Sequence, residues 1–235
     1  GLVLNDNASA AADFRAESAT EPNMIYLDSD GSADGYLYFG GTTNGVRISK
    51  GGELRLLGTA TVWDDSMIPA TSFRTGGTGL TFAQFIGNIR LHRFDVGDIF
   101  YVQVQLPHGI KENSTIYPHL HLAINSAIGA TGYNVEVTTE HSWANIGSVF
   151  PGPTVTSTGL VKSFQNAAQY TPGIMPLASV VPGAGQGGIS SYVIYKIERI
   201  TASVQPITPA ASVFLLGMDI HYEIDSMGSA TELAK

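Results

Sequence analysis

The chain has 235 residues, of which only 14% are charged, against about 25% in a typical soluble domain. Its 43% hydrophobic content excludes intrinsic disorder, because a disordered chain combines low hydrophobicity with high net charge. The net charge of −8 argues against nucleic-acid and anionic-membrane partners, since clustered lysine and arginine bind both. With no cysteine, disulfides and thiolate metal sites are excluded. No apolar run is long enough to span a bilayer, so we expect no membrane insertion.

The charges are unevenly distributed along the chain. Residues 1–65 hold ten acidic and four basic side chains, a net charge of −6, whereas the remaining residues have a net charge of only −2. A shift of this kind is typical of a domain boundary. We therefore predict an N-terminal β-rich stalk or oligomerisation segment over residues 1–62 and a β-sandwich head domain over residues 63–235. The first residue is Gly1 rather than Met, and no signal peptide is visible, so we expect a processed or truncated terminus.

The N-terminal part is predicted to form short strands separated by turns. Residues 23–28, 36–40, 45–49 and 53–63 are rich in β-forming residues, and Gly, Asp and Asn-rich segments separate them. Turns at about ten-residue spacing are typical of an antiparallel meander. Because strands this short cannot hold a core of their own, we expect further copies of the segment to bury its apolar side.

The rest of the chain alternates apolar and polar residues with a period of two. Residues 100–106 and 133–141 alternate clearly, which predicts half-buried antiparallel strands. The inward face near the C-terminus is predicted to hold Phe214, Leu216, Met218, Ile220, Tyr222 and Ile224. Residues 82–88 could form one helical turn, and no other helix is expected. The predicted fold class is mainly β: an antiparallel, jelly-roll-like β-sandwich head preceded by a short-strand β stalk.

The sharpest local feature is the sequence Pro118-His119-Leu120-His121. On a strand, His119 and His121 point to the same face, as two ligands of one metal would. A cupin enzyme is disfavoured, because the glutamate that follows the second histidine in that pattern is missing. Three copies around a threefold axis would supply six imidazoles, an octahedral site suited to iron or nickel. The alternative that the two histidines are hydrogen-bonded surface or interface residues stays open.

A second polar group lies near the C-terminus. Asp219, His221 and Glu223 share one face of their predicted strand and could join His119 and His121 if the two strands are neighbours. Such a cluster can bind metal or take part in acid–base chemistry. The simpler interpretation is a solvated or subunit-facing surface, so we assign none of these residues to a site.

Three further motifs are weaker. The sequence DSDGSADG over residues 28–35 resembles the start of a calcium loop, but Ala33 and Phe39 occupy positions where an EF-hand needs Gly and Glu. An Asp/Gly turn is expected there, with a looser calcium site as the alternative. Asp64 and Asp65 cannot flank one glycosidic bond, since adjacent strand residues point to opposite faces, and we predict a turn or strand-end cap. The glycine-rich residues 183–188 are predicted to link two strands.

No enzyme signature is present. The sequence lacks a Gly-x-Ser-x-Gly elbow, a phosphate-binding glycine loop and a His-Glu-x-x-His motif. We therefore expect that the protein is not an enzyme, and we assign no catalytic, cofactor-binding or metal-binding residues and no cofactor.

Several segments resemble virion proteins. The sequence ADFRAES at residues 12–18, followed by NMIYLD at residues 23–28, resembles a short β element of bacteriophage tail-fibre and related virion proteins. In that family the pattern is roughly DFRVES…N…LFVDG, usually followed by VGIG, and residues 35–41 depart from it. Further segments resemble structural proteins of uncultured, often aquatic, phages; they are residues 58–65, 118–121, 143–147 and 220–229.

This resemblance implies a structural virion protein on the particle surface. It would be a homotrimeric fibre, spike or capsid-decoration component, with other virion proteins and a host-surface glycan as candidate partners. Attachment is expected through exposed loops at residues 73–80, 125–132 and 150–159. Two alternatives stay open: a virion-associated polysaccharide depolymerase, and a cellular carbohydrate-binding or filament-forming β protein.

Overall fold

A computed structural model describes residues 14–16, 25–28, 36–40, 43–49, 51–77, 79–203, 211–229 and 231–232. Over these residues the regular structure is β-strand, apart from one 3-10 turn at Ala70–Ser72. The predicted mainly-β class is therefore confirmed. None of the described residues belongs to a helix that could cross a membrane.

The chain divides into two compact units. The first comprises Gly1–Asp64, Pro107–Glu112 and Glu223–Lys235, and the second comprises Asp65–Leu106 and Asn113–Tyr222. The first unit thus combines the N-terminal segment with two segments from later in the chain. Whether residues 1–62 and 63–235 behave as separate domains stays a prediction.

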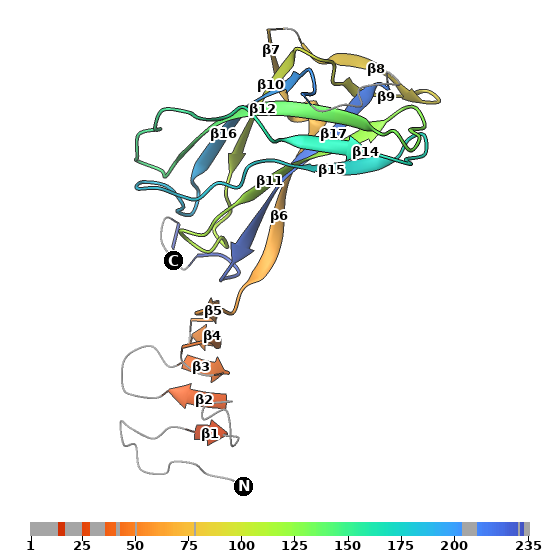
Figure 1. The fold of residues 1–235 in the computed structure, drawn as a ribbon. Coiled ribbons are helices and arrows are strands. Elements are labelled where there is room, and N and C mark those ends of the chain that lie inside the picture. The colour runs from red at the N-terminus through yellow and green to blue at the C-terminus, as the bar shows by residue number, and fades with distance from the viewer. Residues whose placement is uncertain are drawn as a thin grey trace. The chain divides into compact units, whose positions relative to one another are not determined.

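The first unit contains a five-stranded meander in which each strand pairs antiparallel with the next. Figure 1 shows these strands as five successive arrows. Its strands are β1 (Phe14–Ala16), β2 (Ile25–Asp28), β3 (Tyr36–Phe39), β4 (Gly45–Ser49) and β5 (Leu54–Leu57). The predicted strand over residues 53–63 ends early, and β6 (Val62–Pro69) begins after a turn. Gly58 has a φ of +62° in that turn, and a Cβ there would lie 1.9 Å from Asn44 Oδ1. Only glycine fits this position.

The second unit is a sandwich of two antiparallel sheets. One holds β10, β16 and β12 side by side, with β7 beyond β10 and with β13 and β14 on β12. The other holds β15, β11, β17, β9 and β8 in that order, with β6 on β17. Their bounds are β7 (Arg74–Gly77), β8 (Thr81–Ile86), β9 (Ile89–Arg93), β10 (Asp98–Gln105), β11 (Tyr117–Ile124), β12 (Tyr133–Ala144), β13 (Thr154–Thr156), β14 (Val161–Phe164), β15 (Pro172–Pro176), β16 (Tyr192–Ile200) and β17 (Val213–Ile224).

The strand order is that of a jelly roll. Between β9 and β17, every connection crosses from one sheet to the other, except the passage from β12 through β13 to β14. The result is two interlocked four-stranded sets, β9-β17-β11-β15 and β10-β16-β12-β14. This is the double Greek key arrangement of a jelly roll, so the jelly-roll-like prediction is confirmed.

The core lies between the two sheets. On β10, Phe100, Val102 and Val104 are buried and alternate with exposed neighbours, as the sequence predicts. Trp143 on β12 is fully buried, and its indole N–H donates to Ser191 Oγ at 2.9 Å. Burial of an aromatic ring with its polar atom satisfied adds packing energy at no hydrogen-bonding cost.

The predicted inward face of β17 is wrong at Leu216, whereas Phe214 is buried as predicted. The pairing of β11 with β17 shifts register at His121/Leu122, so that Leu122 lies opposite Leu215. Because one extra residue reverses the side-chain alternation, Leu215 enters the core and Leu216 is 37% exposed. Phe214 is 1% exposed and packs against Phe85, with ring centroids 5.1 Å apart.

Two other predictions need correction. Residues 82–88 form most of β8 and the following turn rather than a helical turn, and the predicted loop at residues 73–80 contains β7, which pairs with β10. Tertiary pairing overrides the weak local signal in both segments. The predicted half-buried strand over residues 133–141 also needs correction. On β12 both faces are covered near Glu136, which is 2% exposed and accepts hydrogen bonds from the backbone N–H and the hydroxyl of Ser203.

Candidate metal centre

The two histidines of β11 lie next to the acidic and histidine residues of β17. These strands pair antiparallel, with His119 opposite Asp219, Tyr117 opposite His221 and His121 opposite Gly217. The sequence predicted one cluster only if these two strands are neighbours, and they are. Glu223 does not join the group, because its carboxylate pairs with Lys111 Nζ at 3.1 Å.

The core positions the polar face. Leu120 on β11, together with Met218 and Ile220 on β17, is fully buried. Since neighbouring residues of a strand point to opposite faces, burial of these three turns His119 and Asp219 to the outer face of the sheet. The apolar residues of the two strands thus determine where the polar cluster lies.

The donor atoms of His119, His121 and Asp219 converge. His119 Nε2 lies 2.9 Å from His121 Nε2, and His121 Nε2 lies 3.0 Å from Asp219 Oδ2. His119 Nε2 and Asp219 Oδ2 are 3.7 Å apart. Each residue offers one ligand atom within this small volume, which is the requirement for a shared metal ion.

Gly217 allows β6 to lie close to β17 beside the cluster. It lies opposite His121 in the pairing of β11 with β17. A Cβ at position 217 would lie 3.0 Å from the carbonyl oxygen of Ile68 on β6. Any larger residue would therefore need a shift of the β6 backbone.

Burial lowers the tendency of His119 to take up a proton. His119 is 7% exposed. Burial, followed by the neighbouring imidazoles of His221 and His121, lowers the pKa of His119. Its ring is therefore neutral at neutral pH and can offer a lone pair, which an imidazolium cannot.

His221 and Asp65 flank the cluster. The His221 ring packs edge-on against His119 with centroids 4.5 Å apart, and its Nε2 lies 3.0 Å from Asp65 Oδ1. Asp65 and Asp64 lie within β6, so the predicted turn or strand-end cap at this pair is wrong. The sequence offered no signal for the partnership of Asp65 with His221, because it depends on the pairing of β6 with β17.

The remaining sequence motifs lie elsewhere. Most of the predicted calcium-like turn at residues 28–35 falls outside the described residues. The glycine-rich residues 183–188 form turns between β15 and β16, as predicted. The predicted loop at residues 125–132 contains no named strand, whereas the one at residues 150–159 contains β13.

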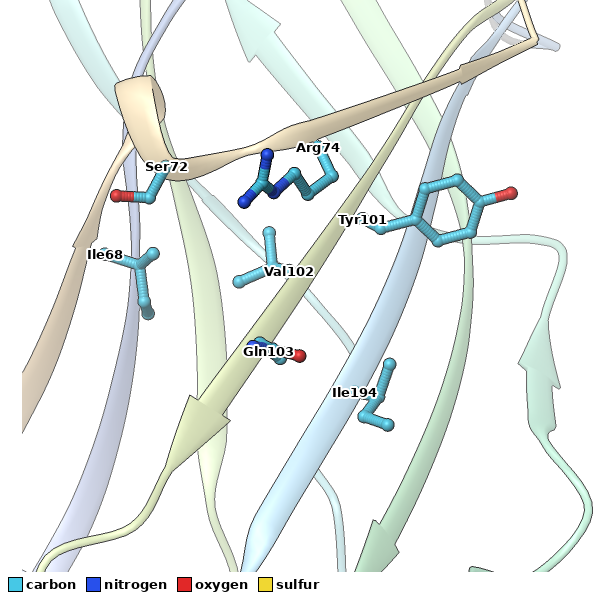
Figure 2. Close-up of a pocket in the computed structure, with 7 residues that line it drawn as sticks. All are labelled: Ile68, Ser72, Arg74, Tyr101, Val102, Gln103 and Ile194. Atoms are coloured by element: carbon cyan, nitrogen blue, oxygen red, sulfur yellow. The ribbon is translucent and has the colours of Figure 1, made fainter.

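Two hollows lie along β10 and β16 of the other sheet, and Ile68 of β6 and Ser72 also line the first of them. Figure 2 shows the first, where Tyr101 and Gln103 of β10 lie beside Ile194 of β16 and Arg74 of β7. The second shares Tyr101 and Ile194 and is completed by Glu140, Lys196 and the segment that begins at Phe150. A row of cross-strand neighbours links them, in the order Arg74, Tyr101, Lys196 and Glu140.

The second hollow contains an ion pair. Lys196 Nζ lies 2.7 Å from Glu140 Oε1, and this hydrogen bond raises the pKa of Lys196. Together the two hollows present a mixed aromatic and charged surface on β7, β10, β16 and β12. The period-two pattern of β10 places Tyr101 on its outer face, but only the pairing of the strands reveals the row.

Comparison with known proteins shows no family and only weak structural similarity. No family model matches the chain, and no curated protein matches its sequence. Two solved structures, of infectious bursal disease virus strains Gt and Gx, are similar with TM-scores of 0.32 and 0.30 and identities of 8% and 7%. The alignments cover 81% and 89% of this chain, but only 43% and 45% of those chains. TM-scores this low carry no argument about the fold or the role of this chain.

Proposed function

We propose that the protein is a structural component of a virion: a homotrimer in which the β1–β5 meander forms a stalk and the jelly roll forms an attachment head. The observation that carries this proposal is the apolar face of the meander. The sequence resemblance to phage tail-fibre proteins supports the viral setting and the choice of a trimer.

The meander separates its side chains by face. Cross-strand pairing places Leu37, Ile48 and Leu54 in one row and Phe39, Val46 and Leu56 in another, and both rows lie on the same face. The opposite face carries Tyr36, Tyr38, Arg47, Ser49, Arg55 and Leu57. None of the six apolar side chains is buried within the described part of the chain, and Phe39 is 40% exposed.

A sheet with one apolar face needs a second layer. In an antiparallel sheet one face normally packs on a core, and a continuous apolar patch otherwise marks an interaction surface. Two further copies of the meander, arranged about a threefold axis, would turn the three apolar faces toward one another. Each chain would then bury the same residues, as cyclic symmetry requires.

The head supplies a surface suited to attachment. Tyr101 is 40% exposed and Phe150 is 44% exposed, and both line the hollows that contain Arg74, Lys196 and Glu140. Exposed aromatic rings beside hydrogen-bonding side chains favour binding of saccharides. Two of the predicted attachment segments, residues 73–80 and 150–159, contribute to these hollows.

Native mass spectrometry of the full chain tests the assembly. The wild type is expected as a trimer, and Leu56→Asn is expected to weaken assembly more than about 100-fold, because three amides would be buried without partners. The matched control is Leu57→Asn, since Leu57 is the adjacent leucine of β5 on the opposite face. A monomeric wild type, or equal effects of the two variants, would overturn the proposed assembly.

A glycan array tests the attachment role. Tyr101→Ala is expected to reduce binding of the wild-type ligand at least about tenfold, because loss of the ring removes its stacking contact. Tyr117→Ala is the control, because Tyr117 is 45% exposed on β11 in the other sheet. If both tyrosine variants bind as wild type does, the hollows are not the attachment surface.

A further inference from the structure

The geometry points to a metal site within a single chain: we propose that His119, His121 and Asp219 bind one first-row transition-metal ion, with Zn²⁺ as the reference ion. The ion would connect β11 to β17 on the outer face of the sheet. This site requires no second copy of the chain and is independent of the virion role proposed above.

The separations between ligand atoms suit such an ion. With bonds of about 2.0–2.1 Å, tetrahedral ligand atoms lie about 3.3 Å apart and adjacent octahedral ones about 2.9 Å apart. The observed separations of 2.9, 3.0 and 3.7 Å among the two Nε2 atoms and Asp219 Oδ2 span these values. Small side-chain rotations would bring all three atoms to bonding distance of one point.

Hydrogen bonds alone do not satisfy the cluster. His121 Nε2 either carries one proton or accepts one, so it cannot make full hydrogen bonds to both His119 Nε2 and Asp219 Oδ2. Asp219 Oδ1 is also buried and has no hydrogen-bond partner. A cation held by Asp219 Oδ2 would neutralise the carboxylate and so lower the cost of leaving Oδ1 buried without a hydrogen-bond partner.

The donor set selects the class of ion. Two imidazoles and one carboxylate suit Zn²⁺, Fe²⁺, Co²⁺ and Ni²⁺, whereas Ca²⁺ and Mg²⁺ prefer oxygen ligands throughout. The His121 side chain is 32% exposed, so solvent can reach this side of the cluster. Water can therefore complete the coordination shell.

Stoichiometry separates this site from the threefold alternative. A site built from His-x-His pairs of three chains would bind one ion per trimer and would not need Asp219. The in-chain site binds one ion per chain and depends on Asp219. The two arrangements therefore predict different ratios and different effects of the same substitution.

The experiment uses the full, untagged chain after chelator treatment, titrated with ZnCl₂ in a calorimeter. We expect one Zn²⁺ per chain, and Co²⁺ is expected to give the visible absorption of a protein-bound ion at the same ratio. His119→Gln and Asp219→Asn are each expected to weaken binding by about 100-fold or more, since loss of an outer partner alone costs 10–100-fold. Circular dichroism checks folding, and His121→Gln replaces any variant that fails, because His121 is the most exposed ligand.

The matched control is His221→Gln, which removes an adjacent histidine that pairs with Asp65 rather than with the donor atoms. We expect this variant to keep one Zn²⁺ per chain. Three results would overturn the proposal: no stoichiometric binding, one ion per three chains with Asp219→Asn unaffected, or a loss in His221→Gln equal to that in His119→Gln.

Discussion

The meander of β1–β5 and the jelly roll are both antiparallel, but they differ in what covers their apolar side chains. In the jelly roll two sheets face each other, and Phe100, Leu120 and Trp143 are fully buried. In the meander one sheet carries an apolar face, and Leu37 and Ile48 remain half-buried. An alternating pattern therefore identifies an apolar face but not the layer that covers it.

The largest expected effect belongs to the jelly-roll core. Trp143→Ala is expected to lower the free energy of unfolding by about 3–5 kcal/mol, because it opens a cavity and leaves Ser191 Oγ without its indole donor. Urea unfolding followed by far-UV circular dichroism measures it, at several protein concentrations. Trp143→Phe is the control and should lose less. A loss below about 1 kcal/mol for Trp143→Ala would mean that this core is not the main source of stability.

In the meander, the cost of a substitution should depend on protein concentration. In the assembled protein, Leu37→Ala is expected to cost about 2–5 kcal/mol per chain, because its neighbours then cover it as a core residue. At concentrations where the chain is monomeric the cost should fall to about 1 kcal/mol, since Leu37 is then only partly buried. Thermal unfolding across a dilution series measures both values, and Leu57→Ala is the control on the opposite face. A cost independent of concentration would remove the distinction between the two regions.

A smaller effect tests how much the buried hydrogen bonds of Glu136 stabilise the jelly roll. Glu136→Gln is expected to cost about 1–3 kcal/mol, because the buried carboxylate accepts two hydrogen bonds from Ser203. Glu140→Gln on the same strand is the control, and it should cost less than about 1 kcal/mol because its pair with Lys196 is partly exposed. If Glu136→Gln and Glu140→Gln lower the free energy of unfolding in urea equally, burial of Glu136 adds nothing to stability.

The smallest expected effect depends on pH. Burial lowers the pKa of His141 on β12 below its ordinary value of 6.5. As the pH falls below 6.5, the unfolded chain takes up the proton first, so this residue reduces stability toward acid and has no effect above that pH. His141→Gln should therefore flatten the acid side of a stability–pH curve. An unchanged acid slope would show that His141 does not contribute.

Local patterns predicted much of the architecture. The period of two on residues 100–106 gave the correct buried face of β10, and turn residues separated the strands of the meander. Hairpins between neighbouring strands depend on short turns and side-chain alternation, and both are visible in the sequence. The same reasoning placed His119 and His121 on one face.

Local patterns failed where distant segments meet. Leu216 was expected in the core, but the register shift between β11 and β17 moves Leu215 there. Residues 73–80 were expected as a loop, yet β7 forms because the edge of β10 is available for pairing. Neither the shift nor the available edge leaves a signal in the segment itself.

The sequence by itself determined the mainly-β class, the apolar and polar faces of many strands and the shared face of His119 and His121, because each depends on residues close together in the chain. Tertiary structure decided the order of the strands within the predicted jelly roll, and it decided that Asp219 lies beside the two histidines. His121 meets Asp219 across a separation of 98 residues. Packing of the two sheets on a common core sets the register between β11 and β17, and that register brings the three donor atoms together.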